Sequence, residues 1–229
     1  MWENTAAAFA AAHAAGAEYL ETDCRVTADG DVVLVHDETM ARLADDPRRV
    51  DEVRTRELSR MFEAHGGLLT VADALDLFPT SRFNIDVKAP RAADLLGPVL
   101  VEHTHRTLVT SFSDGNRRSA VAAVLRAGAA LRPATSGGAR TIAAVRGLTA
   151  LHLSPARILR DIDALQVPER RRGVTVLTPA LVRAAHAHGT EVHVWTVDDP
   201  AAMRRLVSAG VDGIVTDRAD VAVDVLARE

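Results

Sequence analysis

The stretch that decides the fold runs from residue 18 to residue 37 and reads EYLETDCRVTADGDVVLVHD. Its apolar runs at residues 18–24 and 32–36 have the length of β-strands. Asp29-Gly30 between them marks a tight turn, and the second run ends at His36-Asp37. An alanine-rich helical stretch, residues 5–15, precedes the first strand and is closed by Gly16.

Beyond this stretch, short apolar runs alternate with helical segments along the rest of the chain. This alternation predicts βα units and a parallel sheet. Further strands are expected at residues 83–87, 107–111, 148–153, 191–197 and 211–216, with a short one near 129–132; helices are expected at residues 72–78, 116–127, 179–188 and 200–208. The count of strands approaches eight, so we expect a single α/β barrel domain over residues 1–229. The charged segment 37–67 is predicted to be a solvated loop and helix at the barrel rim.

Composition narrows the class of protein. The chain has 229 residues, a net charge of −4 and no basic footprint for nucleic acid. Its single cysteine, Cys24, excludes an internal disulfide framework. No apolar run approaches the roughly 18 residues of a membrane span, and the start of the chain is not basic as in a signal peptide. These features predict a cytoplasmic protein.

Lys88 is the only lysine among 27 basic residues, and the other basic residues are all arginine. Since an ammonium group is a compact point charge and a guanidinium group is a planar fork, this position is a candidate for a site that needs the smaller cation. The alternative is that one lysine has survived by chance.

Carboxylates gather on the faces of two predicted strands. Glu21 and Asp23 alternate along the first strand, and Asp86 and Lys88 alternate along a later one, so each pair shares a face. Three carboxylates inside a barrel predict a hard divalent cation, and Lys88 beside them would help to hold a phosphate ester. The alternative is that Glu21 and Asp23 lie on a solvated edge or pair with arginines. His36 ends its strand at the rim where barrel active sites lie.

Seven motifs in order resemble the glycerophosphodiester phosphodiesterase family. They are Glu-Asn-Thr at residues 3–5, Gly-Ala-x-x-x-Glu-x-Asp at 16–23, Thr-x-Asp-Gly-x-Val-Val-x-x-His-Asp at 27–37, Asn-Ile-Asp-x-Lys at 84–88, Ser-Phe at 111–112, Val-Trp-Thr-Val at 194–197 and Gly-Val-Asp-Gly-Ile-x-Thr-Asp at 210–217. The resemblance implies a TIM-type (β/α)8 barrel of the phospholipase C-like class. It also implies hydrolysis of a glycerophosphodiester to glycerol 3-phosphate and an alcohol.

By the same resemblance, the site residues take definite roles. Glu21, Asp23 and Asp86 match the ligands of a divalent cation, Mg²⁺ or Ca²⁺. Lys88 matches a lysine near the phosphate, Trp195 matches a residue that lines the substrate pocket, and His36 matches the second of two catalytic histidines. Asp86 stands where the family usually has glutamate; the related sphingomyelinase D enzymes have aspartate there.

One family motif is missing. The His-Arg-Gly segment that ends the family's first strand and carries the first catalytic histidine does not occur in this sequence. The resemblance therefore implies a truncated member whose barrel lacks its first strand and leaves an edge open for self-association. Two alternatives stay open: a barrel that binds metal or phosphodiester without turnover, and a sphingomyelinase D-like phospholipase.

Overall fold

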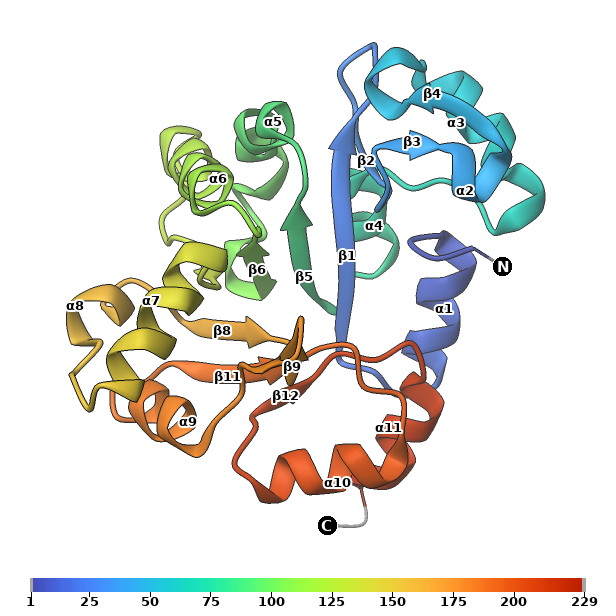
Figure 1. Ribbon diagram of the computed structural model, residues 1–229. Helices are drawn as coiled ribbons and strands as arrows, with labels where there is room; N and C mark the ends of the chain where they lie inside the picture. Colours follow the sequence, from blue (N-terminus) through green and yellow to red (C-terminus); the bar gives the residue numbers. More distant parts are fainter. Residues whose placement is uncertain (1, 228–229) are drawn as a thin grey trace. The chain divides into compact units, whose positions relative to one another are not determined.

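The computed structural model describes residues 2–227, which form two compact units, residues 2–133 and residues 134–227. Figure 1 shows the elements of each unit in the order of the chain. Each unit contains parallel strands with helices packed against them, so the predicted α/β class is confirmed. The single domain over residues 1–229 stays a prediction.

The sheet of the first unit holds the predicted site. Its strands are β1 (Tyr19–Val26), β2 (Val32–Leu34), β5 (Arg82–Val87) and β6 (Thr107–Thr110), in the order β2-β1-β5-β6. β1, β5 and β6 are parallel, as predicted. β2 is antiparallel to β1, with Cys24 opposite Leu34, in agreement with the tight turn predicted at Asp29-Gly30. The physical reason is the short connection at residues 27–31, since a parallel crossover needs a dozen or more residues.

Four helices cover one face of this sheet, as the ribbon in Figure 1 shows for α5 and α6. They are α1 (Ala6–Ala14), α4 (Val71–Leu77), α5 (Pro90–Leu100) and α6 (Asp114–Arg126), and a 3-10 turn, η3 (Thr104–Arg106), precedes β6. The hydroxyl groups of Thr5, Thr70 and Ser113 accept backbone hydrogen bonds at the N-termini of α1, α4 and α6. The apolar side chains of β1 and β5 pack against these helices. The other face of the two strands is left for polar groups and carries the predicted site.

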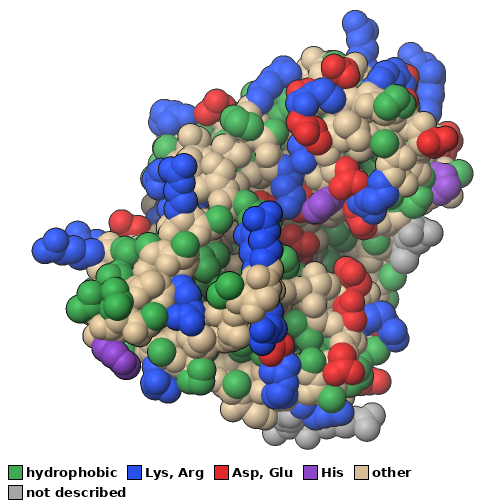
Figure 2. Space-filling model, viewed as in Figure 1, with side chains coloured by type: hydrophobic (Ala, Val, Ile, Leu, Met, Phe, Trp, Pro, Cys, Tyr) green, Lys and Arg blue, Asp and Glu red, His purple; other side chains and the backbone are tan. Residues whose placement is uncertain are grey.

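Residues 37–67 form a small structure whose core also includes Val33 and Val35. It consists of β3 (Thr39–Met40), α2 (Ala41–Ala44), β4 (Asp46–Arg49), η1 (Val50–Glu52), α3 (Thr55–Phe62) and η2 (Glu63–His65). Met40, Val50, Leu58 and Phe62 are almost fully buried in one cluster, so the prediction of a solvated loop and helix was wrong. Its arginines pair with neighbouring carboxylates, and Figure 2 shows basic and acidic side chains interleaved over this region.

The second unit has a parallel sheet of β8 (Ala164–Val167), β11 (Glu191–Val194) and β12 (Gly213–Ile214), in the order β12-β11-β8. It also contains β7 (Ala134–Thr135), the hairpin β9 (Arg170–Arg171) and β10 (Val174–Thr175), and the helices α7 (Ala139–Ala150), α8 (Ala156–Leu159), α9 (Pro179–His186), α10 (Pro200–Ser208) and α11 (Ala219–Leu226). The strand predicted at residues 148–153 was wrong, because α7 occupies its first half. The strand expected near 129–132 was also wrong, because the chain becomes extended only at β7.

None of the helices within residues 2–227 is both long and apolar enough to cross a membrane. The cytoplasmic location stays a prediction.

Candidate active site

Asp23 and Asp86 face each other across two neighbouring strands, because they are register partners in the parallel β1–β5 pair. Both are buried, with exposed fractions of 7% and 6%. Lys88, two residues after Asp86, places its Nζ 2.9 Å from Asp23 Oδ1 and 2.6 Å from Asp86 Oδ2. The structure thus brings together three of the predicted site residues, with one ammonium between two carboxylates.

The charges of this cluster depend on one another. Burial raises the pKa of Asp86 above its ordinary value, although the positive charge of Lys88 opposes the increase. Burial by itself lowers the pKa of Lys88, but the charges of Asp23 and Asp86 outweigh it, so the pKa of Lys88 lies above its ordinary value. The ammonium is therefore held in its charged form.

Asn4 supports Asp23 from the chain segment before α1. Its Nδ2 donates to Asp23 Oδ2 over 3.1 Å, and its Oδ1 accepts from the Thr22 hydroxyl over 2.7 Å. Asn4 adopts a positive φ of 56°, a conformation that asparagine tolerates better than most residues. Sequence reasoning missed this role, although Asn4 is the middle residue of the Glu-Asn-Thr motif and could have been found from it.

His36 lies two residues beyond the end of β2, which runs antiparallel to β1 and brings the chain back toward Asp23. Val35 N donates to Asp23 O over 3.1 Å, so the antiparallel turn places His36 beside the carboxylate cluster. The charge of His36 also acts on the pKa of Asp86. Its side chain is 51% exposed.

Asp37 orients the His36 ring. His36 Nδ1 lies 2.6 Å from Asp37 Oδ1, so the contact with Asp37 leaves Nε2 as the other ring nitrogen. Arg42 Nε donates to Asp37 Oδ2 over 2.5 Å, and the Arg42 guanidinium also binds Glu3. The hydrogen bond from Arg42 lowers the pKa of Asp37, with a further contribution from His36. Sequence reasoning missed Asp37 and Arg42 as supports of His36.

Glu21 lies two residues before Asp23 on β1 and therefore on the same face of the strand. Its register partner on β5 is Asn84. Glu21 is exposed. Within residues 2–227, no group of three His, Cys, Asp or Glu side chains is arranged to hold a metal ion. The predicted ligand set of Glu21, Asp23 and Asp86 therefore stays a prediction.

Two buried oxygen atoms on β5 nevertheless suit a cation. Asn84 Oδ1 and Asp86 Oδ1 are both inaccessible to solvent and have no hydrogen-bond partner among the described residues. Buried acceptors are rarely left in this condition, and carboxylate and amide oxygens are ligands that Mg²⁺ and Ca²⁺ accept. The donor chemistry of this face fits a hard divalent cation.

Two aromatic residues of the family motifs, Phe112 and Trp195, belong to different units. The Lys88 Nζ lies 5.1 Å from the centre of the Phe112 ring, which follows β6 in the first unit. Trp195 follows β11 in the second unit, and the peptide bond between Trp195 and Thr196 is cis. The role of Trp195 in a substrate pocket stays a prediction.

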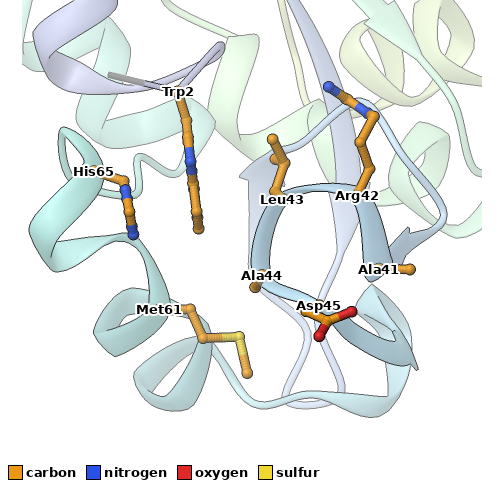
Figure 3. A pocket seen from close by; sticks show the side chains of 8 residues that line it. All are labelled: Trp2, Ala41, Arg42, Leu43, Ala44, Asp45, Met61 and His65. Carbon is orange, nitrogen blue, oxygen red and sulfur yellow. The ribbon is translucent and has the colours of Figure 1, made fainter.

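A cavity of about 560 Å³ lies between Trp2 and residues 41–65, and none of Asp23, Asp86 and Lys88 lines it. It is lined by Trp2, Ala41, Arg42, Leu43, Ala44, Asp45, Met61 and His65. Figure 3 shows the parallel rings of Trp2 and His65 on one side and Leu43 and Ala44 on the other; the two rings are 3.9 Å apart. Arg42, one of the lining residues, also donates a hydrogen bond to Asp37, which contacts the His36 ring.

The fold and the sequence of this chain define a phosphoric diester hydrolase. The model of the Glycerophosphoryl diester phosphodiesterase family matches residues 1–221, and the chain belongs to this family. The predicted family and class of enzyme are confirmed.

Known relatives agree with this assignment. The chain is 40% identical to the "probable glycerophosphodiester phosphodiesterase 2" of Mycobacterium tuberculosis, over 97% of this chain and 84% of that protein. A crystal structure of a glycerophosphodiester phosphodiesterase from Thermotoga maritima has a TM-score of 0.72 at 23% identity, covering 100% of this chain and 93% of that one. A phosphodiesterase from Oleispira antarctica, solved with sn-glycerol-3-phosphate, has a TM-score of 0.72 at 16% identity and covers 96% of this chain and 89% of that one. These two structures confirm the TIM-barrel type of fold.

Proposed function

We propose that the protein hydrolyses a glycerophosphodiester to glycerol 3-phosphate and an alcohol, with a divalent cation, Mg²⁺ or Ca²⁺, as cofactor. The observation that carries the proposal is Lys88 held between Asp23 and Asp86, with His36 beside them. The product bound by the Oleispira antarctica relative supports the choice of glycerol 3-phosphate.

Each residue of this cluster has a definite task in the proposed reaction. Glu21, Asp23 and Asp86 would hold the cation, which supplies positive charge for the phosphoryl oxygens when bound. Lys88 would bind a further phosphoryl oxygen and stabilise the negative charge that builds up on it. His36, with Nδ1 fixed by Asp37, would exchange a proton with the substrate through Nε2. Trp195 would line the pocket for the rest of the substrate.

A chain that binds phosphodiester without turnover is the second candidate, because the sequence has no His-Arg-Gly segment. Loss of one acid–base group lowers a rate by roughly 10²–10⁴-fold, so binding and turnover must be measured separately. A sphingomyelinase D-like activity is the third, since Asp86 stands where those enzymes have aspartate.

The test is hydrolysis of glycerophosphocholine and of sphingomyelin by the same preparation, with and without a chelator. We expect release of glycerol 3-phosphate from the first substrate, loss of activity with chelator and recovery with Mg²⁺ or Ca²⁺. Lys88→Arg should keep the charge but weaken substrate binding, because the planar guanidinium does not fit a compact ammonium's place between two carboxylates. Binding without release of glycerol 3-phosphate would support the second candidate, and hydrolysis of sphingomyelin alone would support the third.

A further inference from the structure

We infer that Asn84 is a further ligand of the cation, and that its side-chain oxygen and Asp86 Oδ1 bind the ion on the side of Asp86 that Lys88 leaves free. The inference rests on the proposed function, and it adds a neutral oxygen ligand to a set of carboxylates.

The starting observation is a pair of buried acceptors without hydrogen bonds. Asn84 is 7% exposed and Asp86 is 6% exposed. Neither Asn84 Oδ1 nor Asp86 Oδ1 has a hydrogen-bond partner among the residues that the structure describes. An acceptor that is buried in this way destabilises a folded chain unless a ligand binds it.

The strand geometry places these acceptors together. Asn84 and Asp86 are two residues apart on β5, so their side chains leave the same face of the sheet. Across the sheet, Glu21 is the register partner of Asn84 and Asp23 is the register partner of Asp86. Four oxygen-bearing side chains therefore occupy four adjacent positions on two parallel strands.

Lys88 does not satisfy the two free acceptors. Its Nζ binds Asp86 through Oδ2 and Asp23 through Oδ1, and Asp23 Oδ2 is taken by Asn4. The remaining oxygen of Asp86 is Oδ1, on the same carboxyl group but outside the contact with Lys88. A cation bound at Asp86 Oδ1 and Asn84 Oδ1 would therefore leave the ammonium in place to contact the substrate.

The charges of the cluster suit a divalent ion. Three carboxylates, Glu21, Asp23 and Asp86, carry three negative charges, and Lys88 carries one positive charge. The surplus of two negative charges matches one Mg²⁺ or Ca²⁺ ion. A neutral amide oxygen from Asn84 adds a ligand to the coordination sphere without adding to the repulsion between carboxylates.

The experiment is calorimetric titration of the full chain with CaCl₂ and with MgCl₂. Asn84→Leu removes the oxygen and keeps the side-chain size, and we expect cation binding about 10-fold to 100-fold weaker, the range found when groups around a metal site are removed. Asn84→Asp keeps an oxygen and should bind at least as tightly as the parent. Asn116→Leu, the same substitution at a partly buried asparagine on α6, is the control and should bind like the parent.

Thermal unfolding of the metal-free proteins separates a ligand from a structural residue. The metal-free Asn84→Leu protein should have a Tm equal to or above that of the parent, because an unsatisfied acceptor has been removed. Asn84→Ala serves as the second variant if leucine does not fit.

The outcomes overturn different statements. Unchanged cation affinity in Asn84→Leu and Asn84→Ala, with a parent that binds the ion, would overturn the role of Asn84 alone. A lower affinity accompanied by a lower metal-free Tm in both variants would assign Asn84 to the scaffold and overturn it as well. A parent that binds neither ion would overturn the metal dependence of the proposed function, and the role of Asn84 with it.

Discussion

His36 is fixed through a chain of charged neighbours that comes from distant parts of the sequence. Asp37 Oδ1 contacts the ring at Nδ1, Arg42 binds Asp37, and Glu3 binds Arg42 from 39 positions earlier in the chain. An imidazole held at one nitrogen presents the other in a constant direction. The orientation of the proton-transfer group of the proposed reaction thus depends on Asp37.

Asp37→Asn removes the charge and keeps the shape. We expect kcat to fall by roughly 10-fold to 100-fold with little change in KM, since losing the acid–base group itself typically costs 10²–10⁴-fold. Stability should also change with pH. Because the folded pKa of Asp37 is lowered, its stabilising contribution is complete above its unfolded pKa near about 4 and is lost as the pH falls through the folded value.

The measurement is the difference in Tm between the parent and Asp37→Asn from pH 6 to pH 3. The variant should be less stable at pH 6, by under about 1 kcal/mol because Arg42 is half exposed and solvent screens the pair. The difference should shrink as the pH falls. A difference that stays constant over this range would show that the charge of Asp37 contributes nothing to the fold.

The contact between α5 and α6 depends on a glycine. A Cβ atom at Gly97 would lie 2.5 Å from the carbonyl oxygen of Ala123, so these helices approach more closely than any side chain allows. α5 and α6 together cover β5 and β6, and β5 carries Asp86 and Lys88. The spacing of two helices therefore affects the strand on which the site is built.

Gly97→Ala should lower the free energy of unfolding by about 1–3 kcal/mol through overpacking. Gly147→Ala is the matched control, because Gly147 also lies inside a helix and a Cβ there meets nothing within 4 Å. That change should stabilise the protein by up to about 1 kcal/mol through helix propensity. Urea unfolding measures both, and equal effects of the two substitutions would contradict the close approach.

The sequence predicted those elements whose signals are local. Helices with polar N-caps such as Thr178 and Asp199 were found within two residues of their true bounds. The pairing of Asp23 with Asp86 could be expected from alternation in two parallel strands. β8 was missed because its four residues include Gln166, and residues 148–153 were misread because three of them continue an alanine-rich helix. The contacts of Asn4 with Asp23 and of Arg42 with Glu3 join residues 19 and 39 positions apart, so alternation within a strand does not predict them. Asp37 is adjacent to His36 in the sequence and could have been considered as its partner.

At the level of the whole molecule, one edge of β1 is only partly paired within the first unit. β2 pairs with Cys24–Val26, so within this unit the edge of β1 from Tyr19 to Thr22 has no strand beside it. Unpaired strand edges offer backbone donors and acceptors to other chains. We therefore expect the 229-residue chain to self-associate as its concentration rises.

Light scattering coupled to gel filtration measures the mass over a range of concentrations. Tyr19→Lys should reduce the associated fraction, because a charged side chain at an edge discourages pairing. Leu131→Lys replaces another exposed apolar residue, away from β1, and should leave association unchanged. A parent that stays monomeric at every concentration would contradict the prediction.

The antiparallel return of β2 has a consequence for how the gene can change. The position of His36 beside the carboxylates depends on the register of the hairpin. In this register Cys24 is opposite Leu34, and Val35 N donates a hydrogen bond to Asp23 O. Side chains alternate between faces, so deletion of one codon between Val32 and His36 would send the imidazole to the opposite face, whereas deletion of two would keep its face. In this short stretch, a change of length by one residue therefore moves His36 away from the carboxylates even where every buried side chain of the strand is kept.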